Sequence, residues 1–168
     1  MGGGVAFLAL LVAVGCSSTG PKNVDRFVGT WTYSSGTLDA TCPGGLVPPL
    51  SSGLAGQTAT VTAGTTSDLV ATQQTAYGTC TIKFSVDGTT ASAPTGQTCT
   101  LNVLVAGTTV PVTLTVTSWT LTSSADGSTL TTAAAGTASS SGGLVMDCPV
   151  TVNGSATKSG AGGDASAG

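Results

Sequence analysis

The sequence predicts an all-β fold, an antiparallel up-and-down meander of about eight to ten strands that forms a closed or nearly closed barrel. Apolar and polar residues alternate with period two along several segments, as in strands that bury one face. Turn sequences rich in Gly and Asp separate these segments, and none has the pattern of a helix longer than one turn. A two-sheet β-sandwich is the alternative; the barrel is favoured because closure removes exposed strand edges.

Charged side chains are few: four Lys and Arg residues stand against seven Asp and Glu residues, with no His and a net charge of −3. Thr and Ser must therefore supply most of the polar surface, and β-branched Thr fits a strand well. The chain has no basic cluster, which argues against binding of nucleic acid. Aromatic residues make up 4% of the chain, so we expect a core of mainly Val, Leu and Ala that benefits from disulfide bonds.

The N-terminus has the features of an export signal. Residues 5–15 form an apolar run that is too short to span a bilayer. The run ends in Ala13-Val14-Gly15-Cys16, which resembles the lipobox of bacterial lipoproteins. The resemblance implies that residues 1–15 are a signal peptide, and that Cys16 is acylated and anchors the protein to a membrane. An ordinary secretory signal is the alternative.

Three further segments follow this signal. We expect residues 16–25 to be the lipidated cysteine with a flexible tether, residues 26–158 a single β domain, and residues 159–168 a disordered tail of Gly, Ala and Ser. Ser17, and not Asp, follows the cysteine. By resemblance to enterobacterial sorting, this implies a lipid-anchored protein of the cell envelope, at the outer membrane.

The first strand of the domain is expected within residues 27–42, after one helical turn at residues 23–26. It begins with Phe27-x-Gly29-x-Trp31, which resembles the calycins, the group of lipocalins and fatty-acid-binding proteins. The resemblance implies an up-and-down barrel in which the Gly allows close strand approach and the Trp plugs one end. In lipocalins a cationic side chain from the last strand packs over that Trp, and Lys158 is the candidate here.

The later strands are placed by alternation and turn residues. Residues 43–56 are rich in Pro and Gly and are expected to form a loop. Trp119 and Leu121 are out of phase with the apolar residues before them, and a β-bulge near residues 117–118 would return both to the core. The last strand either turns at Asn153-Gly154 or continues to residue 158. Further strands are expected at residues 59–63, 69–72, 80–86, 99–105, 110–121, 130–137 and 144–152, with turns at 87–88 and 126–127.

The four cysteines after Cys16 lie on apolar faces of an exported domain, which predicts two disulfide bonds. We predict Cys80–Cys99, between neighbouring strands, and Cys42–Cys148, between the first strand region and the last. A metal site is disfavoured because the chain has neither a Cys-x-x-Cys pair nor a His. No cofactor is expected.

Catalytic chemistry finds little support in the sequence. With no His and no Glu, the general bases are isolated Asp residues, of which Asp87 and Asp126 belong to turns. Ser155-x-x-Lys158 matches the Ser-x-x-Lys motif of penicillin-binding enzymes, but a Ser-Asp-Asn element is missing. We therefore predict a protein without enzymatic activity.

Two functions remain as hypotheses. The first is a structural or surface-interaction role, in which the anchored lipoprotein meets the envelope or an envelope protein through a Thr-rich, weakly charged surface. The second is lipocalin-like binding of a small apolar ligand inside the barrel, with Trp31 and Trp119 near one end of the site. The two differ in one physical property, which is whether the barrel contains a cavity.

Overall fold

The structure is a computed structural model that describes residues 22–44, 49–75, 77–105, 107–140 and 147–159. Its one helical element in these ranges is a 3-10 turn at Val24–Arg26, as predicted. No helix within these ranges is long and apolar enough to cross a membrane. The strands are β1 (Gly29–Ala40), β2 (Leu50–Gly53), β3 (Thr58–Ala63), β4 (Leu69–Thr75), β5 (Gly78–Asp87), β6 (Thr90–Ser92), β7 (Thr98–Val105), β8 (Thr108–Ser123), β9 (Thr129–Ser140) and β10 (Cys148–Lys158).

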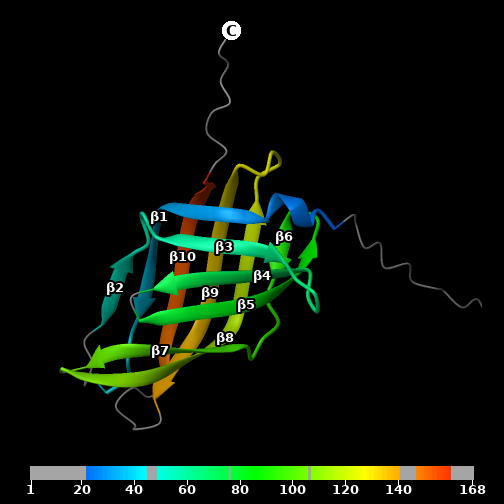
Figure 1. Cartoon of the computed structure of the whole chain (residues 1–168). Helices are drawn as coiled ribbons and strands as arrows, with labels where there is room; N and C mark the ends of the chain where they lie inside the picture. The colour runs from blue at the N-terminus through cyan, green and yellow to red at the C-terminus, as the bar shows by residue number, and fades with distance from the viewer. Residues whose placement is uncertain (1–21, 45–48, 76, 106, 141–146, 160–168) are drawn as a thin grey trace, which may run out of the picture.

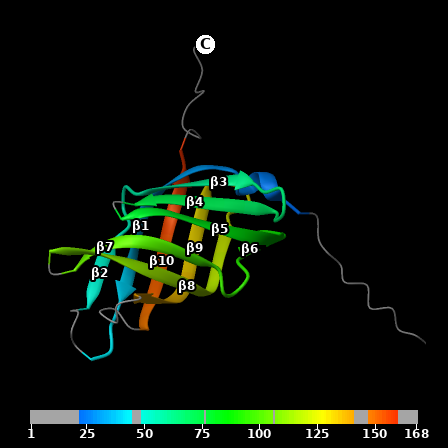
Figure 2. The same cartoon turned by 60° about the horizontal axis from the view of Figure 1, so that its bottom comes forward.

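Eight of these strands form a closed antiparallel barrel in the order β1, β3, β4, β5, β6, β8, β9 and β10. The pairing of β10 with β1, from Val150 opposite Ala40 to Lys158 opposite Trp31, closes the barrel. Figures 1 and 2 show the sheet curling so that β1, in blue, meets β10, in orange and red. The predicted barrel is confirmed, in place of the sandwich, and it is compatible with a calycin-like fold.

The other two strands continue barrel strands past an interruption. β2 continues β3 along β1, where the Leu54 N–H donates to the Gly36 carbonyl at 3.0 Å. β7 continues β6 along β8, where the Ala93 N–H donates to the Trp119 carbonyl at 2.8 Å. The prediction of a loop throughout residues 43–56 was therefore wrong. All residues of β2 are exposed, so the segment lacks the alternation by which a strand is recognised in sequence.

Large side chains fill one end of the barrel, which we call the closed end. Phe27, Trp31 and Phe84 have no exposed surface there. The Trp31 indole N–H donates to the Phe27 carbonyl at 2.7 Å, and Lys158 Nζ lies 5.4 Å from the centroid of the Trp31 ring. Gly29 makes room for the lysine, because a Cβ at that position would lie 2.7 Å from Lys158 Cε. The structure thus places a cation over the Trp of the Phe-x-Gly-x-Trp segment, as the calycin resemblance implies.

A bulge in β8 corrects the phase of its apolar residues. The register of β8 against β9 shifts between Val116 and Ser118, where the sequence predicts a bulge. After the shift Leu121 is buried, and Trp119 packs against the main core. The sequence therefore located both the irregularity and its effect.

The last strand continues to its end without a turn. β10 is unbroken from Cys148 to Lys158, so Asn153-Gly154 lies inside the strand. Leu144 and Met146, assigned to this strand from the sequence, lie outside the described residues. The same is true of the signal peptide, of Cys16 and of residues 160–168.

Two disulfide bonds link distant parts of the barrel wall, with the pairing predicted from the sequence. Cys42, just after β1, is bonded to Cys148 at the start of β10. Cys80 on β5 is bonded to Cys99 on β7. The second bond joins two strands that have no ladder of backbone hydrogen bonds between them in the described residues.

Candidate functional site

The half of the barrel opposite the closed end is hollow. It contains a cavity of about 1100 Å³ that opens to solvent. A volume of this size lies at the upper end of the range of about 300–1,000 Å³ that is usual for small-molecule sites. The cavity differs sharply from the closed end, where the void between the large side chains has a volume of about 20 Å³.

The cavity wall is mostly aliphatic and uncharged. One side is formed by β7 to β10, whose lining residues are small or medium in size. These residues are Leu101, Val103, Leu104, Val112, Leu114, Val116, Ala134, Ala135, Gly136, Ala138, Val150 and Val152. No Asp, Lys or Arg side chain is among the described residues that line the cavity. Such a surface suits an apolar molecule and offers no counter-ion to a charged one.

Exposed apolar side chains gather at the opening. Leu50, Tyr77 and Leu104 are the large hydrophobic residues of the described chain that stay exposed, at 51%, 49% and 65%. All three line the cavity, although they come from β2, the β4–β5 connection and β7. An apolar patch on a chain of this kind marks a surface that contacts another apolar object.

The opening exists because the barrel wall is discontinuous at this end. Within the described residues β2 pairs only with β1, and β7 pairs only with β8, so each has an unpaired edge. β5 and β7 are held together by other means: the Gln97 amide bonds to the Lys83 backbone at 2.9 and 2.8 Å, and the Asn102 N–H donates to the Tyr77 carbonyl at 2.7 Å. The Cys80–Cys99 disulfide completes this junction.

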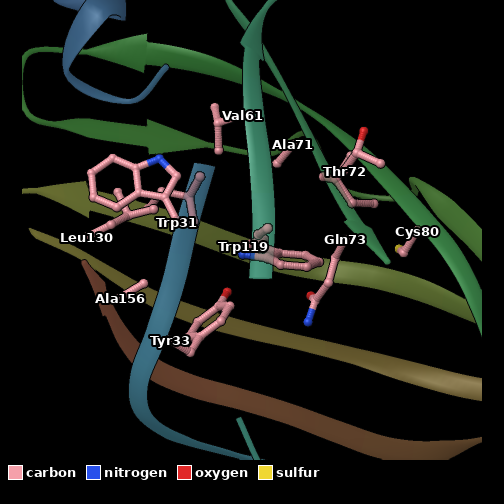
Figure 3. Close-up of a pocket in the computed structure, with 13 residues that line it drawn as sticks. Trp31, Tyr33, Val61, Ala71, Thr72, Gln73, Cys80, Trp119, Leu130 and Ala156 are labelled. Atoms are coloured by element: carbon pink, nitrogen blue, oxygen red, sulfur yellow. The ribbon is translucent and has the colours of Figure 1, made fainter. Parts of the chain in front are cut away.

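A polar cluster lies at the boundary between the cavity and the small void, since Gln73 and Trp119 line both. Trp119 lines both the cavity and the small void, and its indole N–H donates to the Thr132 hydroxyl at 2.9 Å. Thr132 also bonds to the Tyr33 hydroxyl; burial raises the pKa of the Tyr33 phenol, and this hydrogen bond opposes the rise. In Figure 3 the side chains of Tyr33, Gln73 and Trp119 point towards one another from β1, β4 and β8.

Leu54 is a further residue that lines the cavity. This side chain is 2% exposed and packs where Gly36 on β1 lies opposite Gly154 on β10. Gly36 has φ +135°, and a Cβ there would collide with the Asn153 carbonyl oxygen. The close approach of β1 and β10 at this point requires glycine and leaves the space that Leu54 fills.

Three glutamines, Gln57, Gln73 and Gln74, line the cavity, and two of them are hydrogen-bonded to each other. Gln73 on β4 and Gln57, just before β3, both line the cavity, and Gln73 Nε2 donates to Gln57 Oε1 at 3.2 Å. Gln57 Nε2 in turn donates to the Gly53 carbonyl at 3.2 Å. In the described residues Gln73 Oε1 accepts no hydrogen bond, so it is available to a ligand.

The structure separates the two tryptophans that the sequence analysis brought together. Trp119 lines the cavity, whereas Trp31 lies in the closed end beneath Lys158 and borders only the small void. Sequence reasoning missed Gln73, although a signal exists. Gln73 lies on the same face of β4 as Leu69 and Ala71, and among these three residues it is the polar one.

The described residues contain no group of three or more His, Cys, Asp or Glu side chains that could hold a metal ion. Comparison of the chain with protein-family models, with curated proteins and with solved structures finds no match.

Proposed function

We propose that this protein binds a small apolar molecule inside its barrel. The observation that carries the proposal is the cavity of about 1100 Å³, with its uncharged wall and its rim of exposed apolar side chains. Of the two hypotheses from the sequence, a surface-interaction role gives this cavity no purpose, whereas lipocalin-like binding needs it.

The hollow itself is a reason to expect a ligand. Protein interiors are normally close-packed, and apolar surface left in contact with water forgoes about 25 cal/mol per Å². A ligand that covers the aliphatic wall and the rim would recover this free energy. The lipid predicted at Cys16 would hold the barrel beside a membrane, where apolar molecules are plentiful.

The experiment uses the secreted chain with Cys16→Ser and the uncharged fluorescent probe N-phenyl-1-naphthylamine. We expect saturable binding with enhanced probe emission and energy transfer from Trp119, which lines the cavity. Ala134→Trp should weaken binding at least about tenfold, because Ala134 lines the cavity and the indole would occupy it.

Ala133→Trp is the matched control, since Ala133 is the neighbouring residue on β9, is exposed and does not line the cavity. It should bind the probe like the parent chain. Absence of saturable binding by the parent chain, or equal binding by the two variants, would contradict the proposal. Native mass spectrometry of the purified parent chain would give the mass of any molecule that co-purifies.

A further inference from the structure

We infer that the cavity selects uncharged lipids, such as fatty alcohols, esters or amides, over fatty acids and other anionic amphiphiles. The inference rests on the proposed function and names the ligand class of the same site. It follows from where the chain places its cations and from the amide group that Gln73 presents on the cavity wall.

All four cationic side chains of the chain lie in the described residues, and none lines the cavity. Lys158 is fixed over Trp31 at the closed end. Lys22 forms an ion pair of 2.8 Å with Asp68. Lys83 is exposed on β5, with its side chain on the face opposite to the buried residues of that strand. Arg26 belongs to the 3-10 turn that leads into the closed end.

Arg26 also lies beside the turn between β8 and β9, since its Cα is 3.6 Å from the position of a Cβ on Gly127. None of the four cationic side chains is therefore placed to pair with a charged ligand in the cavity. Tyr77, a phenol at the rim, contributes no positive charge.

Asp39 is a charged residue of β1 beside the rim, and its side chain is on the outer face, since Leu38 and Ala40 line the cavity and Asp39 does not. Asp39 on β1 accepts hydrogen bonds from Thr37 and from Ser51, the neighbour of the rim residue Leu50. The bonds from Ser51 and Thr37 lower the pKa of Asp39, so its carboxylate is ionised at neutral pH. An anionic head group would find no counter-ion among the described residues of the cavity wall, and the charge on the outer face beside Leu50 has the same sign as the head group.

A carboxylate that entered this cavity would have to take up a proton. Burial without a partner disfavours the ionised form, so the pKa of a bound fatty acid would rise above its value in water. Its apparent affinity would then fall as the pH rises, by about tenfold per pH unit once the free acid is ionised. The affinity of an alcohol of the same chain length would not depend on pH in this range.

Gln73 supplies the hydrogen bonds that a neutral head group needs. Its Oε1 is free to accept from a hydroxyl or amide, and its Nε2, which gives one hydrogen to Gln57, has a second to donate to a hydroxyl or ester oxygen. The Gln57 contact holds the Gln73 amide on the cavity wall.

The test is displacement of N-phenyl-1-naphthylamine from the full chain with Cys16→Ser by dodecanol, methyl dodecanoate and dodecanoate, at pH 7.5 and pH 5.5. We expect dodecanol to displace the probe at a concentration at least about tenfold lower than dodecanoate at pH 7.5, and the ratio to shrink at pH 5.5. Gln73→Lys should reverse the preference, because it places a cation on the wall.

Thr81→Lys, on the exposed face of β5, is the matched control and should leave the preference unchanged. The inference is overturned if dodecanoate at pH 7.5 competes as well as dodecanol, or if none of the three lipids displaces a probe that binds. A parent chain that binds no probe at all would instead overturn the proposed function. The two failures are therefore distinguishable.

Discussion

Removal of the Cys42–Cys148 disulfide should destabilise the domain more than removal of Cys80–Cys99. The cysteines of the first pair are 106 residues apart in sequence, and those of the second 19. In the chain-entropy model, closed loops of these lengths stabilise by about 4.8 and about 3.2 kcal/mol respectively. Since Cys80, Cys99 and Cys148 are all buried, replacement by Ala removes similar packing from both sites, and the difference of about 1.5 kcal/mol reflects loop length.

The assay is equilibrium unfolding in guanidinium chloride of Cys42→Ala/Cys148→Ala and of Cys80→Ala/Cys99→Ala, each in the Cys16→Ser chain. Free energies extrapolated to water must be compared, because the unfolded chain expands when a cross-link is lost and the slope m rises. The loss expected for the long-loop variant is at least about a third of the 5–15 kcal/mol that is usual for a domain. An equal or larger loss in the short-loop variant would refute the entropic reasoning.

Three further outcomes are expected. Thr132→Val removes the acceptor of the Trp119 indole N–H and should destabilise by about 1–3 kcal/mol in urea unfolding, whereas an unchanged midpoint would show that the hydrogen bond is dispensable. Gly29→Ala should cost about 1–3 kcal/mol, because φ is +144° and the new Cβ would meet Lys158; adding Lys158→Ala should restore only part, since the backbone strain remains. Hydrogen bonds from Ser and backbone groups lower the pKa of Asp126 to about 2, so its stabilising effect is present above pH 4 and is lost as the pH falls towards 2; Asp126→Asn should flatten thermal stability against pH in that window, and an unaltered slope would contradict this.

Much of the fold was predictable because each strand carries its own signal. The alternation in Cys80 to Val86 is visible in the sequence and recurs as the burial pattern of β5. The phase break before Trp119 could be explained only by a bulge, and the bulge is there. β2 was missed because Leu50 and its neighbours are held by pairing with β1 and bury nothing of their own.

The site was less predictable than the fold, for a physical reason. The alternation of residues along each strand shows that Val112, Leu114 and Val152 face inwards. It does not show whether side chains from opposite walls of the barrel meet in the middle. That depends on strand tilt, on the irregularity of β1 between Tyr33 and Ser35 and on where the β4–β5 hairpin ends, none of which has a local signature in the sequence. Of the two tryptophans expected near the site, Trp119 does line the cavity, whereas Gln73, a polar residue at an inward position, was missed.

The hollow follows from where the chain places its few large side chains. An eight-stranded barrel has an interior just wide enough for side chains to fill, so size at each level decides between core and cavity. Phe27, Trp31 and Phe84 fill the closed end, whereas mainly Leu, Val, Ala and Gly line the other half and leave it unfilled. The hollow half buries less apolar surface, and both disulfides border it: Cys80 lines the cavity, and Cys148 packs with wall residues of β7, β8 and β9. The disulfides therefore lie where side-chain packing contributes least to the stability of the fold. They stabilise the wall around the cavity without the large side chains that would fill it.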